Sequence, residues 1–264
     1  MIRVLDGKVV LVTGASRGIG QSIAERFAAD GAAVAVTART VEDGDHLLPG
    51  SISSTVAGIR SAGGTATAIA ADLARPEDRR RLIDQVTSEL GAVDILVNNA
   101  AITYFEPVAD FDEAHFRLMF EVQVRAPFEL AQMVLPGMRE RRSGWILNIS
   151  SGAAMHPVGP PYNRVSGGTV YGMCKAALER FTTGLASEVH GEGIAVNVLS
   201  PSGLVLTPGV LHHKLDQHTP VDRHEPVSFM AEAAHVLCSG DPAVLTGRVT
   251  YARPLLEEFD RIPE

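Results

Sequence analysis

The stretch Val9-Val-Leu-Val-Thr-Gly-Ala-Ser-Arg-Gly-Ile-Gly20 decides the fold of this 264-residue chain. Its apolar first half is typical of a strand buried on both faces, and its glycine-rich second half opens an amphipathic helical pattern. Glycines permit a tight turn and let a pyrophosphate approach the backbone at a helix start. A glycine cluster alone can be an ordinary turn, but the flanking strand and helix favour a dinucleotide site. Its residues are expected to be Gly14, Ser16, Arg17, Gly18, Ile19 and Gly20.

Short apolar runs and longer helical patterns continue to alternate to the end of the chain. The pattern predicts strands at residues 9–12, 33–37, 67–70, 95–97, 145–149, 194–199 and 248–251. It predicts helices near residues 19–30, 52–62, 76–90, 111–138, 171–190 and 228–239. Such alternation predicts an α/β fold, a Rossmann-like doubly wound parallel sheet of about seven strands with helices on both faces. The length favours a single domain, residues 1–264.

Two loops interrupt this rhythm. Residues 40–51 form a longer connection than a strand-to-helix turn needs, and residues 156–169 are rich in proline and glycine. Loops of more than about 12 residues are often functional. Both loops are therefore candidates for contact with a ligand.

The composition excludes several classes of function. A net charge of −8 argues against a nucleic-acid partner, because phosphate binding needs a basic surface. The basic run Arg79-Arg80-Arg81 is interpreted as the solvated face of a helix. No apolar run approaches the ~20 residues that span a membrane, and no signal-peptide core is visible, so a cytoplasmic location is expected. Cys174 and Cys238 lie in apolar helical patterns and are expected to be free, buried thiols.

The end of the second strand indicates which nicotinamide cofactor is used. An acidic residue there would hold the ribose diol of NAD, whereas an arginine accommodates the 2′-phosphate of NADP. The sequence reads Val36-Thr-Ala-Arg39, with no carboxylate at the strand end. Arg39, helped by Arg17, would form a charge-assisted contact with phosphate, so NADP(H) is favoured over NAD(H). The alternative is a surface arginine that pairs with Glu42 or Asp43.

Tyr171 and Lys175 form the candidate catalytic pair, because residues four apart share one face of a helix. There the ammonium can favour the phenolate and lower the pKa of the tyrosine. Such a phenol can exchange a proton with a carbonyl or an alcohol. The alternative is a helix-start aromatic beside a solvated lysine. Tyr162 is a weaker candidate, since a serine and not a lysine stands four residues after it.

Five motifs occur here in the order seen in the short-chain dehydrogenase/reductase superfamily, and the resemblance covers nearly the whole chain. They are Thr13-Gly-x-x-x-Gly-x-Gly20, Asp72-Leu73, Asn98-Asn-Ala100, Asn148-Ile-Ser-Ser151 and Tyr171-x-x-x-Lys175. The resemblance implies that Tyr171 is the general acid in reduction and the base in oxidation. Lys175 would hold the nicotinamide ribose, and Ser151, rather than Ser150, would hydrogen-bond the substrate oxygen.

The same resemblance implies further contacts with the cofactor and with other subunits. Asp72, with Leu73, would contact the adenine, and Asn99 and Ala100 would line the adenosine ribose. Pro201, Gly203 and Thr207 would meet the nicotinamide. A mobile substrate lid is expected near residues 204–227. A homodimer or homotetramer is implied, through the helices at 111–138 and 171–190.

The chain departs from the family pattern at four places. Gln123 stands where the family has an asparagine that kinks a long helix and anchors a water of the proton relay, and we keep Gln123 as a candidate catalytic residue. Ala101 replaces a glycine. The gap between Ser151 and Tyr171 is longer than usual, so residues 156–168 are expected to loop out over the substrate pocket. Pro201-Ser-Gly203 stands where Pro-Gly is usual.

Residues 204–227 also hold a group of histidines and aspartates, His212, His213, Asp216, His218, Asp222 and His224. Their spacing fits no compact helical pair of metal ligands, so a polar lid is favoured and no metal is expected.

The sequence thus predicts an NADP(H)-dependent oxidoreductase that acts on a small to medium-sized, partly apolar carbonyl or alcohol substrate. Apolar residues expected beside the pocket are Met155, Val158, Pro160, Leu204, Val210 and Leu211. Three alternatives remain: a cofactor-binding protein with little catalysis, a non-redox enzyme such as a methyltransferase on this fold, and a reductase of carbon–carbon double bonds (an enoyl reductase).

Overall fold

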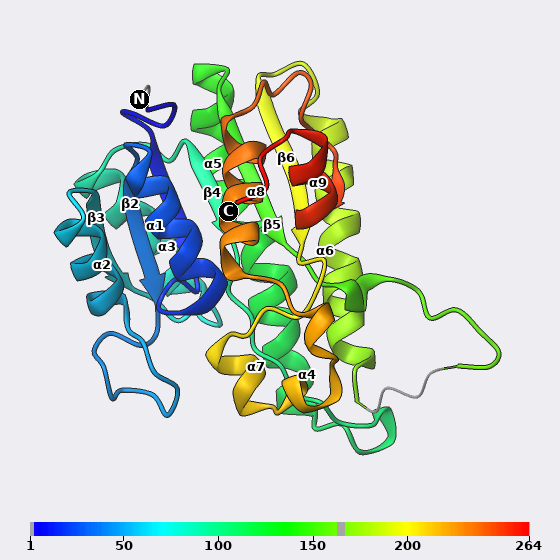
Figure 1. The fold of residues 1–264 in the computed structure, drawn as a ribbon. Coiled ribbons are helices and arrows are strands. Elements are labelled where there is room, and N and C mark those ends of the chain that lie inside the picture. The colour runs from blue at the N-terminus through cyan, green and yellow to red at the C-terminus, as the bar shows by residue number, and fades with distance from the viewer. Residues whose placement is uncertain (1–2, 163–166, 264) are drawn as a thin grey trace.

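A computed structural model describes residues 3–162 and 167–263 of the chain. Its described residues include seven parallel strands in one sheet, in the order β3-β2-β1-β4-β5-β6-β7 (Figure 1). The predicted Rossmann-like fold is therefore confirmed, and each predicted strand is present. The strands are β1 (Val9–Thr13), β2 (Ala33–Ala38), β3 (Thr65–Ala70), β4 (Ile95–Asn98), β5 (Gly144–Ile149), β6 (Ile194–Ser200) and β7 (Val249–Tyr251).

Helices cover both faces of the sheet. One core cluster packs β1 and β2 against α1 (Gly18–Ala29), α2 (Ile52–Ser61), α8 (Val227–Ser239) and α9 (Ala252–Glu258). The other packs the opposite face against α3 (Pro76–Glu89), α5 (Ala126–Arg141) and α6 (Thr169–Glu188).

Strand β1 shows why its sequence has no polar face. Val10 and Val12 belong to one core cluster, whereas Val9 and Leu11 belong to the other. Successive side chains of a strand point to opposite faces of the sheet, so a strand covered on both faces needs apolar residues throughout.

The predicted helix at 111–138 is broken in the structure. Helix α4 (Glu113–Phe120) is capped by Asp112, and a π-helical turn, Glu121–Arg125, separates it from α5. Pro127 explains the break in physical terms, because it has no backbone N–H to donate to the carbonyl of residue 123, four positions earlier.

Two short helices have no counterpart in the sequence prediction. Helix α7 (Pro208–His212) lies in the segment predicted as the lid, with Thr207 capping its first turn. Helix α9 follows β7 directly. Both are too short to show a helical period in the sequence.

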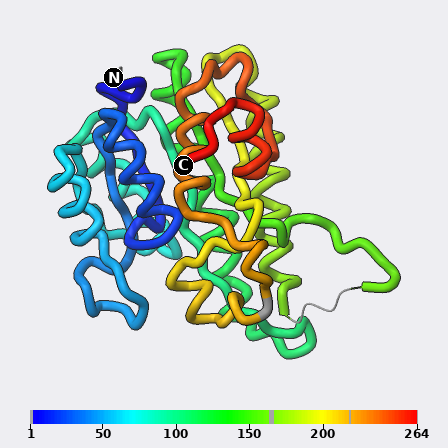
Figure 2. The backbone as a smooth tube through the Cα atoms, viewed as in Figure 1, coloured from blue at the N-terminus to red at the C-terminus, as the bar shows by residue number. Residues whose placement is uncertain are grey.

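The carboxyl ends of the strands carry the long connections. The loop after β2 and the segment around α7 both project at this end of the sheet (Figure 2). Strand β1 pairs with β2 on one side and β4 on the other, so the chain order reverses beside β1. Ligands of open α/β sheets bind outside the carboxyl ends at such a point.

Other predictions about the chain have mixed outcomes. Cys174 and Cys238 are free and buried, as predicted. No helix among the described residues is long and apolar enough to cross a bilayer. Arg79 contradicts the predicted solvated face, because its side chain is fully buried between α3 and α5. Residues 163–166, in the loop predicted at 156–169, lie outside the described part of the chain.

Candidate active site

A cleft of about 1270 Å³ opens at the carboxyl ends of the strands. It brings together most of the residues that the sequence singles out, from seven separate segments. Those that line it are Gly14, Ser16, Arg17, Gly18, Ile19, Arg39, Asp72, Leu73, Asn99, Ala100, Ser151, Tyr171, Lys175, Pro201, Gly203 and Thr207. Gly20 and Gln123 lie behind its wall.

The glycine loop is shaped by close approaches of backbone. Gly14 has a φ of +65°, and a Cβ there would lie 2.7 Å from the Cα of Ala100. A Cβ at Gly20 would lie 2.4 Å from Nδ2 of Asn99, which donates hydrogen bonds to the carbonyls of Thr13 and Gly14. The Asn99 side chain therefore stabilises the glycine loop, and the missing side chain of Gly20 leaves space for the Asn99 amide.

The loop fits the pyrophosphate that the sequence predicts. Gly18 also has a left-handed φ, +59°, and a Cβ there would lie 3.0 Å from a side-chain carbon of Thr207. Helix α1 begins at Gly18, and its N-cap residue Arg17 makes no side-chain capping bond. Backbone N–H groups at the start of a helix carry a partial positive charge that suits an anion. The residues present therefore fit a dinucleotide.

The end of β2 presents Arg39 to the cleft. Its side chain is exposed, and within the described residues it makes no ion pair with Glu42 or Asp43. Glu42 instead accepts a hydrogen bond from Ser53 Oγ, 2.7 Å away. The alternative interpretation of Arg39 as a partner of these carboxylates is not supported.

The wall of the cleft after β3 is built around Asp72. Its backbone N–H donates to Asp78, and its own carboxylate accepts a bond of 3.1 Å from the backbone N–H of Ala74. These bonds fix the turn after β3 and hold Asp72 and Leu73 at the wall of the cleft.

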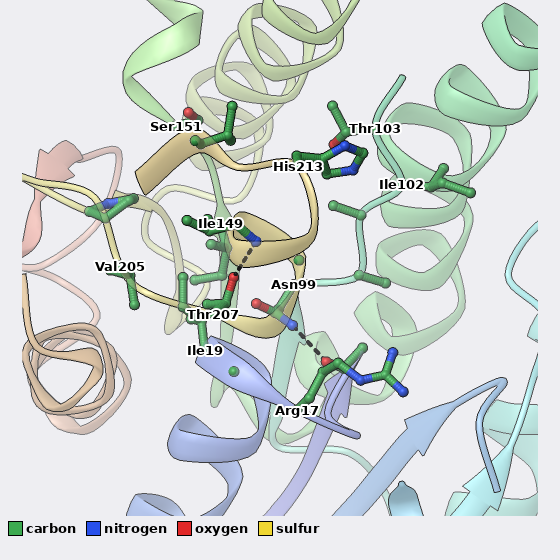
Figure 3. Close-up of a pocket in the computed structure, with 18 of the residues that line it drawn as sticks. Arg17, Ile19, Asn99, Ile102, Thr103, Ile149, Ser151, Val205, Thr207 and His213 are labelled. Carbon is green, nitrogen blue, oxygen red and sulfur yellow. Dashed lines mark hydrogen bonds between the residues drawn. The ribbon is translucent and has the colours of Figure 1, made fainter. Parts of the chain in front are cut away.

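Ser151, Tyr171 and Lys175 lie together at the opposite end of the cleft from Arg17 (Figure 3 labels Ser151 and Arg17). Ser151 and Tyr171 both line this end of the cleft, and Oγ of Ser151 accepts a hydrogen bond of 3.2 Å from the backbone N–H of Ala153. Lys175 lies one turn of α6 further on, with Nζ 5.6 Å from the centroid of the Tyr171 ring and 2.9 Å from the carbonyl oxygen of Ile149. Strand β5 and helix α6 therefore position all three groups.

The pKa of Tyr171 differs from the sequence prediction. Burial raises its pKa above the ordinary value, while the neighbouring hydroxyl of Ser151 opposes the rise. The expected lowering by the lysine is thus wrong for this structure, and the phenol is protonated at neutral pH. Burial also lowers the pKa of Lys175 to about 8, with the charge of Glu179 opposing the shift.

Gln123 lies in the π-helical turn and is buried. Its Nε2 donates to the carbonyl of Ile102 over 2.9 Å, and its Oε1 has no hydrogen-bond partner among the described residues. The carbonyl of Ile102 belongs to the segment that lines the cleft after β4. Gln123 therefore supports the cleft wall from behind.

The turn after β6 is held by contacts that the sequence does not signal. Ser202 donates its backbone N–H to Oε2 of Glu225 over 2.9 Å, and its hydroxyl accepts the backbone N–H of Arg253 over 2.8 Å. The extra serine in Pro201-Ser-Gly203 is thereby tied to the end of the predicted lid and to the start of α9. Glu225 carries no motif, so only the structure identifies it.

The wall of the cleft facing Ser151 was also not predicted from the sequence. Ile102, Thr103 and His213 line it (Figure 3), and the ring of Phe105 packs 6.2 Å from that of Tyr171 and 5.4 Å from that of His213. An aromatic and partly apolar pocket therefore adjoins the tyrosine. Residues 102–105 follow Asn98-Asn-Ala-Ala101 but have no spacing of their own that would mark them.

Only part of the predicted apolar rim is present. Met155, Leu204 and Val210 line the cleft, whereas Val158, Pro160 and Leu211 do not. No described residue of the loop 156–169 lines it, and Figure 1 shows the described part of this loop extending outward beside α6. The expectation that this loop lies over the pocket is therefore wrong for its described residues. No group of three or more metal-ligating side chains occurs in the described ranges.

Comparisons with known proteins agree with this geometry. A family model described as short chain dehydrogenase matches residues 8–217. The 7alpha-hydroxysteroid dehydrogenase of Escherichia coli (strain K12) is 34% identical over 252 residues, 93% of this chain and 92% of the relative. The 3-oxoacyl-[acyl-carrier-protein] reductase of Vibrio cholerae is 34% identical over 253 residues, 94% and 96% of the two chains.

Solved structures are similar over comparable lengths. A short chain dehydrogenase from Burkholderia cenocepacia J2315, in complex with NADP, has a TM-score of 0.77 and 30% identity, covering 94% of this chain and 96% of that one. A metagenomic short-chain oxidoreductase, also in complex with NADP, has the same TM-score and 28% identity, covering 94% and 98%. The chain belongs to the short-chain dehydrogenase/reductase family and is an NAD(P)-dependent oxidoreductase acting on CH–OH and C=O groups.

Proposed function

We propose that this enzyme transfers a hydride between NADP(H) and a carbonyl or alcohol substrate, with Tyr171 as the general acid of reduction and the general base of oxidation. The observation that carries this proposal is that Ser151, Tyr171 and the buried ammonium of Lys175 lie together at one end of the cleft. The cofactor, when bound, supplies or accepts the hydride, and the protein supplies position and a proton.

Each of the three side chains has a separate role. Tyr171, protonated at neutral pH, gives its O–H proton to the substrate oxygen as reduction proceeds. Ser151 hydrogen-bonds the same oxygen and stabilises the charge that develops there. Lys175 holds the nicotinamide ribose, and its ammonium stabilises the phenolate that Tyr171 becomes after proton transfer.

The cofactor preference rests on Arg39. An arginine that is exposed, faces the cleft and lacks an ion pair with Glu42 or Asp43 in the described structure suits a phosphate group. Two similar solved structures are complexes with NADP, which supports the same choice. NAD(H) would be bound more weakly, because no carboxylate at the end of β2 offers itself to a ribose diol.

The substrate is proposed to be a medium-sized, largely apolar ketone or the corresponding alcohol. Phe105, Met155 and Val210 give the pocket an apolar lining beside Tyr171. Relatives named for a 7α-hydroxysteroid and for a 3-oxoacyl thioester indicate two substrate chemistries to test. The segment 204–227 is proposed as the lid, and a homo-oligomer through α4, α5 and α6 is proposed from the family resemblance alone.

The test combines binding and turnover. Wild type, Tyr171→Phe and the control Tyr162→Phe are titrated calorimetrically with NADPH and with NADH. They are then assayed with a 7α-hydroxysteroid, a 3-oxoacyl thioester and an α,β-unsaturated thioester. Tyr162 is exposed on the loop after β5, so its variant controls for loss of a phenol.

We expect micromolar NADPH binding by all three proteins and a turnover about 10²–10⁴-fold lower in Tyr171→Phe only. Equal turnover by Tyr171→Phe and wild type would remove Tyr171 as the acid. NADPH binding with no turnover of any substrate would favour the weakly catalytic cofactor-binding alternative. Turnover of the unsaturated thioester alone would favour the enoyl reductase. Binding of neither cofactor would contradict the proposal altogether.

A further inference from the structure

Arg17 is tied to the loop after β2 in a way that its place in the glycine motif does not suggest. Its Nε donates to the carbonyl of Pro49 over 2.8 Å, and its Nη2 donates to the carbonyl of Gly50 over 2.8 Å and to that of Leu48 over 3.3 Å. A further bond of 3.2 Å reaches the hydroxyl of Thr40. One guanidinium thus holds both the beginning and the end of this loop.

The backbone of the loop sits directly on the glycine motif. Gly50 has a φ of +96°, and a Cβ there would lie 2.5 Å from the carbonyl oxygen of Ser16. After it, Ser51 caps α2 in a reciprocal pair of hydrogen bonds with Ser54. The loop is therefore a fixed part of the cofactor cleft, although most of its side chains are exposed.

His46 is the residue that this arrangement brings into the cleft. It lines the cleft together with Arg39, and its Nδ1 lies 3.0 Å from the backbone N–H of Leu48. Because Nδ1 accepts that hydrogen bond, the proton of the neutral ring is on Nε2, which is left as a donor. The imidazole therefore offers one N–H group beside the guanidinium of Arg39.

The surroundings of His46 are cationic. Burial and the nearby charges of Arg17, Arg39 and His212 all lower its pKa. Two carboxylates of the same loop make hydrogen bonds within the described structure. Asp45 accepts one from the backbone N–H of Glu42, and Glu42 accepts one from the hydroxyl of Ser53. Two arginines and one N–H donor thus lie in this part of the cleft, and among the described residues no carboxylate is bonded to any of them.

We propose that the loop of residues 40–51 is a second reader of the 2′-phosphate of NADP, in which His46 Nε2–H binds the phosphate beside Arg39. Arg17 acts as a positioning residue, because its Nε and Nη2 donate to the carbonyls and the Thr40 hydroxyl of the loop. This inference rests on the proposed use of NADP(H) and adds to it a specificity residue outside the strand-end arginine and the glycine motif.

The experiment measures binding to the whole protein by calorimetry, with NADPH, NADH, adenosine 2′,5′-bisphosphate and 5′-AMP as probes. His46→Asn is the informative variant, because its Oδ1 can still accept the Leu48 N–H while the Nε2 donor is lost. Arg17→Lys keeps the positive charge but removes the hydrogen bonds that Nε and Nη2 donate to the loop. His190→Ala, an exposed histidine at the end of α6, is the control.

We expect His46→Asn to weaken NADPH and the 2′,5′-bisphosphate about tenfold, which corresponds to about 1.4 kcal/mol. NADH and 5′-AMP should bind as in wild type. Arg17→Lys should weaken NADPH and also speed amide hydrogen exchange in residues 41–50 of the free protein, a change that loss of a direct phosphate ligand would not produce.

Two results would overturn the inference. If wild type prefers NADPH and His46→Asn retains that preference in full, the second reader is wrong while the proposed cofactor stands. If Arg17→Lys loses NADPH affinity with unchanged hydrogen exchange in the loop, Arg17 is a direct ligand and not a positioning residue. Equal affinity of wild type for NADPH and NADH would remove the proposed cofactor preference together with the reader.

Discussion

The ammonium of Lys175 donates a hydrogen bond to the carbonyl oxygen of Ile149 across 2.9 Å, where the end of β5 meets the buried side of α6. Lys175 is 3% exposed and makes no ion pair in the described structure, so a full charge is held by a neutral acceptor. Such an arrangement destabilises the fold and is retained at sites where the charge is used.

The first prediction concerns this buried charge. The pKa of Lys175 falls from an ordinary 10.5 to about 8, so between these values the unfolded chain binds more protons than the folded one. Stability therefore rises with pH in this window, and below pH 8 the whole destabilisation is present. We expect Lys175→Met to have a higher free energy of unfolding than wild type at pH 7. This difference should shrink by about 2 kcal/mol by pH 10.

Urea unfolding of the two proteins at pH 7, 8.5 and 10 measures the difference directly. Other groups titrate over this range in both proteins and cancel in the comparison. Parallel stability curves would contradict the prediction, because they would mean that folding does not disturb the protonation of Lys175.

The second prediction concerns Gln123, where the family has asparagine. Asparagine would be too short to reach the carbonyl of Ile102 and would leave a cavity of about one methylene and two unpaired amide atoms. Methionine has nearly the volume of glutamine and also removes Oε1, which already lacks a partner. We therefore expect Gln123→Asn to be less stable than Gln123→Met by about 1–2 kcal/mol.

Thermal and urea unfolding of the two variants and wild type tests this order. A Gln123→Asn variant as stable as wild type would show that an ordered water satisfies the shorter amide, as the family relay requires. In that case its pH–rate profile should also match that of wild type, whereas Gln123→Met should lose turnover without a change in KM.

The sequence alone predicts the sheet well, because most strands share one pattern, a short run of residues that are apolar on both faces. A strand such as Val9–Thr13 is apolar on both faces, and only burial between two helical layers explains such a run. The residues of the glycine loop and the Tyr171–Lys175 pair are likewise predictable, since their chemistry depends on spacing along one turn or one helix.

Contacts between distant segments are not predictable in this way. Glu225 meets Ser202 across 23 positions, and Arg17 meets the loop carbonyls across more than 30. Neither contact has a local pattern, because a hydrogen bond to a backbone group places no demand on the identity of its neighbours. The raised pKa of Tyr171 also depends on packing and not on sequence spacing.

Arg79 shows the same limit for a charged run. The sequence offers three consecutive arginines on an exposed-looking helix, yet Arg79 is fully buried. Its Nη2 donates to Glu121 and its Nε to Glu129, each over 2.8 Å, and its Nη1 donates to the carbonyl of Leu73. The side chain thus joins the turn that carries Leu73 to the helical segment that carries Gln123.

The last prediction follows from this ion triad. Arg79→Met leaves the carboxylates of Glu121 and Glu129 close together, with only the exposed Arg125 to balance them. Removing one partner of a buried ion pair costs about 3–5 kcal/mol, so we expect a loss in unfolding free energy of about 3 kcal/mol at pH 7. Arg80→Met, the exposed neighbour, should change it by less than about 0.5 kcal/mol.

Acid should reduce the effect of Arg79→Met. Burial opposes the shift, but the hydrogen bond from Arg125 and the charge of Arg79 hold the pKa of Glu129 below its ordinary value in wild type. Without Arg79 the pKa of this carboxyl rises, so it takes up a proton as the pH falls toward 5 and the repulsion with Glu121 disappears. Urea unfolding at pH 7 and pH 5 should therefore show a smaller difference between Arg79→Met and wild type at pH 5. A difference that stays constant would mean that lost packing of the arginine side chain, and not uncompensated charge, destabilises the variant.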